Sequence, residues 1–217
     1  MKKHAVIGLG KFGMTMALEL SRLGRYVIAI DGDPDRAKAV QPEVDKAMVS
    51  DATQRDNLVA MGVDKMDVVV VSLGGSMDAV TRVVLHLTRL GVPQIVAKAL
   101  DEDHAEILRR IGATHVVFPE QERAFQLARR LCSENVLYYL SLPSGFSLVE
   151  LAPSKRIVGR SLAELDPGKR YGVQVLAVKE LVPERTVISP GADHKVKDSD
   201  ILVVIGPEEG VKRMREA

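Results

Sequence analysis

The chain has 217 residues, of which 46% are hydrophobic and 27% are charged, with a formal net charge of +1. This length allows one domain of about 130–150 residues and a smaller second domain. The near-neutral charge gives no basic surface for DNA or RNA, so we expect no nucleic-acid partner. No run approaches the ~18–20 consecutive apolar residues of a membrane span, and residues 1–4 lead directly into a strand-like run. We therefore expect a cytoplasmic protein.

Side chains that bind transition metals are scattered along the sequence. Histidines stand at positions 4, 86, 104, 115 and 194, and Cys132, the single cysteine, has no CxxC partner. Cys132 follows Leu131 in an expected helix, which favours a packed hydrophobic residue over a nucleophile. We expect neither a zinc site nor an internal disulfide.

Short β-branched runs alternate with amphipathic stretches from residue 4 to about residue 134. Strands are predicted at 4–8, 26–30, 46–49, 67–72, 94–98 and 115–118, with helices between them. The four valines at 68–71 lack polar alternation, as in a central parallel strand that is covered on both faces. Left-handed helix C-termini are predicted at Gly24, Gly62, Gly91 and Gly112. The pattern predicts an α/β fold with a Rossmann-like, doubly wound parallel sheet.

The pattern changes after a helix that is predicted to run to about residue 133. An apolar segment follows at 136–140, and then a turn at 143–145. Beyond it we predict strands at 146–152, 173–180, 185–189 and 200–206, with helices at 161–165 and 207–216. The chain thus divides into a first domain at 1–134, a linker at 135–143 and a small C-terminal α+β domain at 144–217. We expect this apolar segment to be buried against a partner subunit, and packing on its own domain is the alternative.

A glycine motif follows the first predicted strand. Gly8, Gly10 and Gly13 have the GxGxxG spacing, and Asp31 ends the second strand. The first glycine of such a motif permits a sharp turn, the second lets a phosphate approach the backbone, and the third lets the next helix pack tightly. The N-terminus of that helix favours an anion. A carboxylate at Asp31 can accept hydrogen bonds from ribose hydroxyls and repels a 2′-phosphate. The motif predicts an NAD-like or ATP-like ligand, not NADP.

Several short motifs together resemble the KtrA/TrkA proteins, which are regulators of conductance of potassium (RCK). They are Gly-Leu-Gly-Lys-Phe-Gly at 8–13, Asp31, Asp51-Ala52-Thr53, Ile111-Gly112-Ala113, Pro119-Glu120, Glu134-Asn135-Val136-Leu137, Tyr171-Gly172 and Ile205-Gly206. The resemblance covers essentially the whole chain. It implies an RCK N-terminal nucleotide-binding domain at 1–134, a crossover helix or linker at 135–143, and an RCK C-terminal domain at 144–217.

The resemblance also implies how such a protein acts. Dimers assemble into an octameric ring, which docks at the inner face of the cell membrane on an integral-membrane potassium-translocating subunit of the KtrB or TrkH type. ATP and ADP compete for the N-terminal pocket, and relatives also bind NAD(H). The ring changes shape between the bound states and gates potassium uptake. The expected protein is a regulatory subunit, not an enzyme.

Ligand contacts follow from the same resemblance. They are Gly8, Gly10, Lys11, Phe12 and Gly13 in the phosphate turn; Asp31, Gly32 and Asp33 at the ribose; Asp51 and Ala52 on the adenine side; the backbone of Leu73, Gly74 and Gly75; Lys98 near the phosphates with the adjoining Ala99 and Leu100; and His104 and Glu120, which contact the nucleotide or its Mg²⁺ or Ca²⁺. Lys11 replaces the usual arginine of the family, so a two-point phosphate grip becomes a single-point contact. Lys98 is a charge in an apolar strand and needs a partner.

Ordinary structural roles stay open for five of these residues. Lys11 could be a solvated lysine at a helix start, and Asp33 and Asp51 could be helix N-caps. His104 could lie on the surface of a helix start. Glu120 could be a first-turn glutamate that the helix dipole favours.

The C-terminal domain resembles a module that binds cyclic di-AMP in some family members. The counterparts here are Val187, Ile188, Ser189, Pro190 and Ile157, for which simple dimer packing is the alternative. An NAD-dependent oxidoreductase would need an acid or base in the second domain, where His194 is the only histidine. An NADH-sensing repressor would need a DNA-binding helix and a basic face, and neither is apparent. We therefore expect the potassium-uptake regulator.

Overall fold

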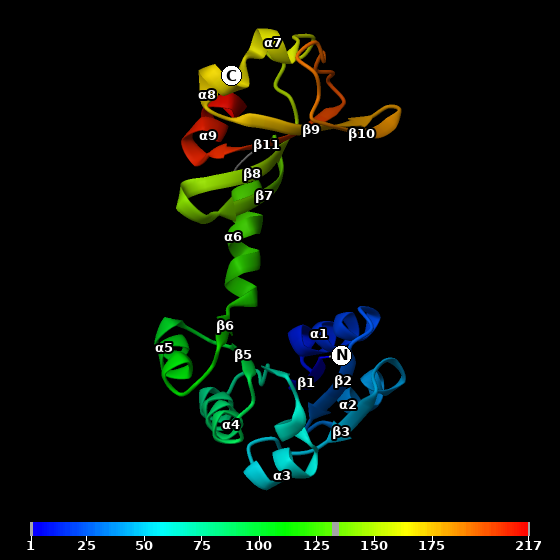
Figure 1. Ribbon diagram of the computed structural model, residues 1–217, viewed down its shortest axis with the longest axis vertical. Helices are drawn as coiled ribbons and strands as arrows, with labels where there is room; N and C mark the ends of the chain where they lie inside the picture. The colour runs from blue at the N-terminus through cyan, green and yellow to red at the C-terminus, as the bar shows by residue number, and fades with distance from the viewer. Residues whose placement is uncertain (1, 132–134, 217) are drawn as a thin grey trace. The chain divides into compact units, whose positions relative to one another are not determined.

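The computed structural model describes residues 2–131 and 135–216 of the chain. These residues form two compact units, Met1–Glu120 and Gln121–Ala217 (Figure 1). The boundary between the units thus precedes the predicted one at residue 134, which lies outside the described residues. Cys132 lies outside them as well, so its packing stays a prediction. Among the described helices, none combines the length and apolar character that crossing a membrane requires.

The first unit contains a parallel sheet whose described strands follow the order β3-β2-β1-β4-β5-β6 (Figure 1). The central strand β1 pairs with β2 on one side and with β4 on the other. The strand order therefore reverses between β1 and β4, which places a topological switch point at their carboxyl ends. This arrangement confirms the predicted doubly wound fold. The strands are β1 (Lys3–Ile7), β2 (Tyr26–Asp31), β3 (Lys46–Val49), β4 (Val68–Val71), β5 (Gln94–Lys98) and β6 (His115–Val117).

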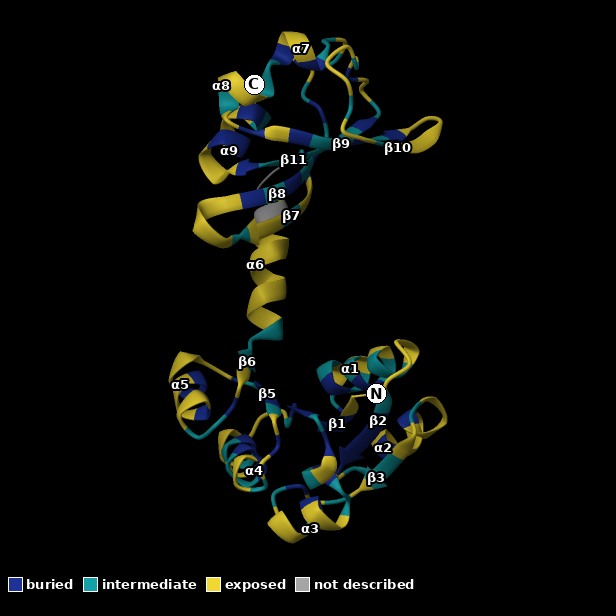
Figure 2. Cartoon of the chain, viewed as in Figure 1, coloured by how far each residue is buried: buried dark blue, intermediate teal, exposed yellow. Residues whose placement is uncertain are grey.

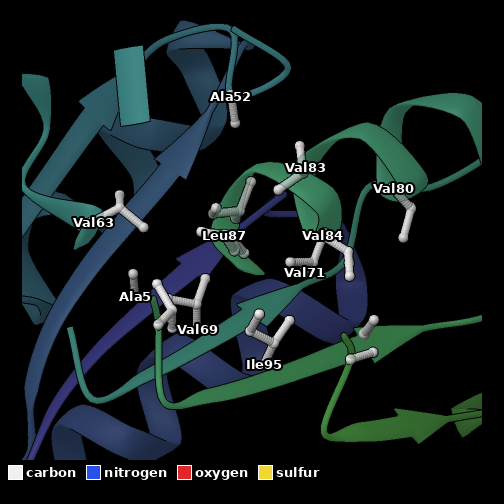
Figure 3. Close-up of a cluster of buried hydrophobic side chains, with 14 of the residues drawn as sticks. Ala5, Ala52, Val63, Val69, Val71, Val80, Val83, Val84, Leu87 and Ile95 are labelled. Carbon is white, nitrogen blue, oxygen red and sulfur yellow. The ribbon is translucent and has the colours of Figure 1, made fainter. Parts of the chain in front are cut away.

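Helices cover both faces of this sheet, and a hydrophobic core lies on each side. Ala17 of α1 and Val40 of α2 pack with Val70 on one face. On the other face, Leu87 of α4 packs with Val69, as Figure 3 shows. All four valines of β4 are buried, as predicted for a strand covered on both faces. The helices are α1 (Lys11–Arg22), α2 (Pro34–Val40), α3 (Arg55–Ala60), α4 (Met77–Arg89) and α5 (Glu102–Arg110), with 3₁₀ turns η1 (Gln41–Glu43) and η2 (Val63–Lys65).

The second unit contains an antiparallel sheet whose described strands follow the order β10-β9-β11-β8-β7. Its core is formed by Val149, Val178, Leu202 and Val204 of the sheet together with Met214 of the last helix. Figure 2 shows buried stretches in β8, β9 and α9. The strands are β7 (Val136–Leu142), β8 (Phe146–Leu151), β9 (Gln174–Leu181), β10 (Glu184–Ile188) and β11 (Asp200–Pro207). The helical segments are α6 (Pro119–Leu131), which begins in the first unit, η3 (Pro143–Gly145), α7 (Leu162–Leu165), α8 (Pro167–Tyr171) and α9 (Glu208–Glu216).

The segment that follows α6 departs from the prediction. A crossover helix at 135–143 is wrong for residues 136–142, because they form β7 and pair with β8 through the turn at Pro143–Gly145. The aromatic and apolar side chains of this segment suit an antiparallel hairpin. Val136 is buried, whereas Leu137 and Tyr138 are 41% and 46% exposed in the single chain.

Candidate functional site

A cavity of about 550 Å³ lies in the first unit at the carboxyl edge of the parallel sheet. It therefore occupies the switch point where doubly wound folds bind their ligands. Residues from several strand ends and helix starts surround it. The lining consists of Gly8, Gly10, Lys11, Phe12, Asp31, Arg36, Ser72, Leu73, Gly74, Ser76, Ala79, Lys98 and Glu120.

Two glycines of the motif are required by packing within the protein. Gly8 has a φ of +90°, and a Cβ atom there would overlap the carbonyl oxygen of Ser72. A Cβ atom at Gly13 would overlap the carbonyl oxygen of Gly8. Gly8 lets the turn approach the backbone that follows β4, and Gly13 brings α1 against the turn, so both glycines shape the turn.

Gly10 differs from its two neighbours in the motif. Its φ and ψ are −65° and −174°, which other residues can also adopt. A Cβ atom at Gly10 would meet no described atom within 4 Å, and the residue lines the cavity. Packing therefore does not require glycine here, whereas a phosphate close to the backbone would. Gly10 is also the N-cap of α1 and has no side chain to cap the first N–H groups, which leaves them for an anion.

Asp31 ends β2 at one end of the cavity and is only 8% exposed. Its Oδ2 accepts a hydrogen bond from the Leu9 N–H at 2.5 Å, and its Oδ1 accepts one from the Asp33 N–H at 2.8 Å. Each carboxylate oxygen has a second lone-pair direction, so the group can accept further donors such as ribose hydroxyls. The two backbone contacts hold the carboxylate at the cavity edge.

Arg36 is a lining residue that the sequence reasoning missed. Its guanidinium lies 3.8 Å from Asp31 Oδ2 and 3.4 Å from Asp33 Oδ2. It stands in the first turn of α2, which follows β2 closely. This position, five residues after Asp31, is the feature of the sequence that could have pointed to it. Its positive charge partly offsets the two carboxylates at this end of the cavity. The other unpredicted lining residues are Ser72, Ser76 and Ala79.

The opposite end of the cavity carries an ion pair. Lys98 ends β5, Glu120 is the second residue of α6, and the Lys98 ammonium donates a hydrogen bond to the Glu120 carboxylate. The Lys98 side chain is 18% exposed and the Glu120 side chain is 69% exposed. The hydrogen bond from Lys98 lowers the pKa of Glu120 below its ordinary value. Glu120 is therefore the partner that the charge of Lys98 needs.

Other predicted contacts lie outside the cavity lining in the described structure. Asp33 caps α2 by accepting a hydrogen bond from the Asp35 N–H at 2.9 Å. Asp51 accepts hydrogen bonds from the hydroxyl and the N–H of Thr53, which lower its pKa, although α3 begins only at Arg55. Nucleotide contacts by these residues stay predictions. The predicted residues outside the lining are Gly13, Gly32, Asp33, Asp51, Ala52, Gly75, Ala99, Leu100 and His104.

His104 is fully buried, so the alternative of a surface position at a helix start is wrong. Asp101 caps α5 and places His104 in the first turn, where its Nδ1 accepts a hydrogen bond from the Leu100 N–H at 3.3 Å. Its Nε2 has no partner among the described residues. Burial lowers the pKa of His104 below its model-compound value of 6.5, so the side chain is neutral at pH 7.

The site suits a divalent cation only when a bound nucleotide supplies further oxygen ligands. In the described part of the chain, no group of three or more His, Cys, Asp or Glu side chains could hold a metal ion. Glu120 supplies one carboxylate at the cavity edge. Mg²⁺ and Ca²⁺ prefer oxygen ligands, and Mg²⁺ is often held by one or two carboxylates together with phosphates of a bound nucleotide.

Comparison with known proteins gives the same division of the chain. Residues 4–119 match the TrkA-N domain family, and residues 146–217 match the TrkA-C domain family. The stretch between the two matches contains most of α6 and all of β7.

Two proteins of Bacillus subtilis are similar over nearly the whole chain. Ktr system potassium uptake protein A is 32% identical, with 98% of this chain and 95% of that protein covered. Ktr system potassium uptake protein C is 35% identical, with 99% and 96% covered. The fold is shared with a solved structure of the GsuK channel bound to NAD, at 18% identity and a TM-score of 0.66, with 98% of this chain and 38% of that chain covered. The chain belongs to the TrkA-N/TrkA-C family, which includes the Ktr system potassium uptake proteins.

Proposed function

We propose that this chain is the nucleotide-sensing regulatory subunit of a potassium uptake system. The observation that carries the proposal is its similarity, over nearly the full length, to Ktr system potassium uptake proteins A and C. The cavity at the switch point supplies the sensing site. ATP, ADP or NAD(H) binds there, and the bound state gates an integral-membrane potassium-translocating subunit of the KtrB or TrkH type.

Different lining residues bind different parts of the nucleotide. The uncapped N–H groups of α1 and the charge of Lys11 hold phosphate next to Gly10. Asp31 accepts hydrogen bonds from the ribose hydroxyls, while Arg36 offsets the negative charge beside it. Lys98 contacts a phosphate farther from the ribose. This assignment orients the nucleotide from Asp31 toward Glu120.

The charged far end of the cavity favours a terminal phosphate over a nicotinamide ring. Lys98 and Glu120 both line this end, and a neutral amide gains less from a buried ammonium than a phosphate does. A bound Mg²⁺ or Ca²⁺ would neutralise phosphate charge and connect it to Glu120. We therefore rank ATP and ADP above NAD(H), which the NAD-bound GsuK structure keeps as an alternative ligand.

The proposed role involves no covalent chemistry. We assign a binding role to the charged residues of the lining. They are Lys11, Asp31, Arg36, Lys98 and Glu120. The oxidoreductase alternative needs an acid or base in the second unit, where the His194 side chain is 14% exposed and its Nε2 lies 3.5 Å from Asp200 Oδ2. No observation favours a hydride-transfer site.

Self-association completes the proposal. Phe125 and Leu131 of α6 and Tyr138 of β7 are 66%, 77% and 46% exposed in the single chain. Figure 2 shows most of α6 as exposed. A second copy of the chain would cover these apolar side chains, which supports dimers that assemble into the octameric ring. The ring would lie at the cytoplasmic face of the membrane, held there by the potassium-translocating subunit.

Cyclic di-AMP is a further proposed ligand of the second unit. Ile157 is buried in the core, so it is not available at the surface of the described chain. Ile188 at the end of the edge strand β10 is 78% exposed and is accessible to a ligand or to a second copy. Titration with cyclic di-AMP separates these two roles.

The first test is a competition titration of the purified chain with ATP, ADP, NAD and NADH in magnesium buffer. We expect ATP and ADP to compete for one site and to bind more tightly than NADH. The second test is rubidium uptake by proteoliposomes that contain the membrane subunit, with and without this chain. Binding of NADH alone, or uptake that does not respond to the bound nucleotide, would contradict the proposal.

A further inference from the structure

The ion pair between Lys98 and Glu120 joins two side chains of unequal freedom. Lys98 is fixed at the end of β5, in a sheet position where Lys98 pairs in register with Val117 of β6, and its side chain is 18% exposed. Glu120 stands in the first turn of α6 with a side chain that is 69% exposed. The backbone of Lys98 is held in the sheet and its side chain is mostly enclosed, whereas the more exposed Glu120 carboxylate can turn into water.

A largely buried ammonium needs an anion at all times. Without a ligand, the Glu120 carboxylate fills this need, and its pKa is lowered by the hydrogen bond from Lys98. Both residues line the cavity, so a phosphate that reaches Lys98 also comes close to the Glu120 carboxylate. Two anions at close range around one ammonium repel each other, which favours release of the more exposed one.

We propose that Glu120 is an internal competitor for the terminal phosphate, which displaces it from Lys98 when the nucleotide binds. This inference rests on the proposed function. It adds that the release of Glu120 from Lys98 signals that the cavity holds a nucleotide. The released carboxylate stays beside the N-terminus of α6, where the helix dipole favours a negative charge. It is then free to take a divalent cation that the phosphates share.

Replacement of Glu120 by a phosphate at Lys98 would change how α6 is held, because the first unit ends within this helix. Glu120 is the last residue of the first unit, and residues 121–131 of α6 belong to the second unit. The ion pair therefore ties the first turn of α6 to β5 only while no phosphate occupies Lys98. A nucleotide that is too short to reach Lys98 leaves this tie intact, so the device responds to the number of phosphates.

The test measures affinity for adenosine, ADP and ATP with EDTA present, for the full chain and for Glu120→Gln. Removal of the competitor should tighten ATP binding by about two- to fivefold, the range of partly exposed ion pairs. The gain should be smaller for ADP and absent for adenosine. Glu122→Gln removes the same charge from an exposed position of α6 outside the cavity lining, and it should leave all affinities unchanged.

A double-mutant cycle and a direct titration complete the experiment. In a Lys98→Gln background, Glu120→Gln should no longer tighten ATP binding, because the shared partner is gone. In the wild-type chain, carboxyl ¹³C NMR should show the lowered pKa of Glu120 returning to or above its ordinary value when ATP is added with EDTA.

The outcomes separate this inference from the proposed function. If ATP binds, but Glu120→Gln gives no gain without metal and the pKa of Glu120 stays low in the complex, the exchange is wrong and the nucleotide-sensing function stands. If the wild-type chain binds none of ATP, ADP and NAD(H), the proposed function itself fails.

Discussion

The two units bury carboxylates in opposite ways. Asp31 of the first unit is held by two backbone N–H groups, and it faces a cavity of about 550 Å³. Glu180 of the second unit accepts hydrogen bonds from both Arg185 and Lys197 and is 2% exposed. The first carboxylate keeps acceptor capacity toward an open space, whereas cations enclose the second. A buried charge therefore points to a ligand only where its surroundings leave it room for one.

The glycine motif gives the strongest test of this contrast, because neighbouring glycines should separate folding from binding. Gly13→Ala places a Cβ atom into the carbonyl oxygen of Gly8, and we expect it to destabilise the first unit by about 3 kcal/mol or more. Gly10→Ala meets no described atom within 4 Å and should change stability by less than about 1 kcal/mol. Urea unfolding measures both values.

Nucleotide titration of the folded Gly10→Ala variant supplies the other half of this test. We expect clearly weaker binding of ATP and ADP, because the new methyl group occupies space that a phosphate would use. Unchanged affinity would show that the opening at Gly10 is not part of the ligand site.

Asp31→Asn tests the open carboxylate. It keeps the shape of the side chain and removes the charge, and we expect nucleotide affinity to fall by about tenfold, the size of one charge-assisted hydrogen bond. Isothermal titration with ADP measures the change. Asp56→Asn in the first turn of α3 is the control for net charge, and its affinity should match the wild type. A loss of the same size in the control would remove Asp31 from its assigned role.

Glu180→Gln tests the enclosed carboxylate. Hydrogen bonds from Arg185, and then from Lys197, lower the pKa of Glu180 from 4.5 to about 2. The folded state thus favours the charged form, so its stabilisation is present above pH 4.5 and is lost as the pH falls to about 2. The variant should melt at a lower temperature than the wild type at pH 7, with the difference closing near pH 2. Weaker nucleotide binding by this variant would break the contrast between the units.

The smallest expected effect concerns His104. Its pKa is lowered from 6.5 by burial, so the folded state favours the neutral ring. The stability that this provides is present above pH 6.5 and is lost as the pH falls through 6.5 toward the lowered value. Thermal unfolding between pH 7 and pH 5 should show a decline in the wild type that is shallower in His104→Asn. An equal decline in both would assign the pH dependence to other groups, such as His4, whose pKa is also lowered.

The sequence predicted secondary structure well where a segment's structure depends mainly on residues close to it in the chain. The valines at 68–71 predicted a strand buried on both faces, and Asp33 before Pro34 offered a helix N-cap as the alternative to a ribose contact, because each pattern depends on neighbours in the chain. The edge strand β7 was missed, because only pairing with β8 makes a strand of that apolar segment.

The candidate site, like the fold, was predictable only in part. The glycine motif and Asp31 could be identified from spacing alone. Arg36 could not, because it is one charged residue among several on a short helix and only the fold brings it to Asp31. A surface position stayed open for His104 because Asp101, Glu102 and Asp103 precede it, whereas the structure buries its ring in the first turn after the N-cap at Asp101.

The ion pair at the far end of the cavity has a consequence for the sensitivity of the protein. Since Glu120 already neutralises Lys98, an arriving phosphate gains only the difference between two ion pairs. Under the proposed exchange, the cavity would fill at higher nucleotide concentrations than a free lysine would allow, and the residue at position 120 would set the threshold. For a sensor of an abundant metabolite, an affinity lowered in this way would keep the dose-response curve within the range where concentrations vary.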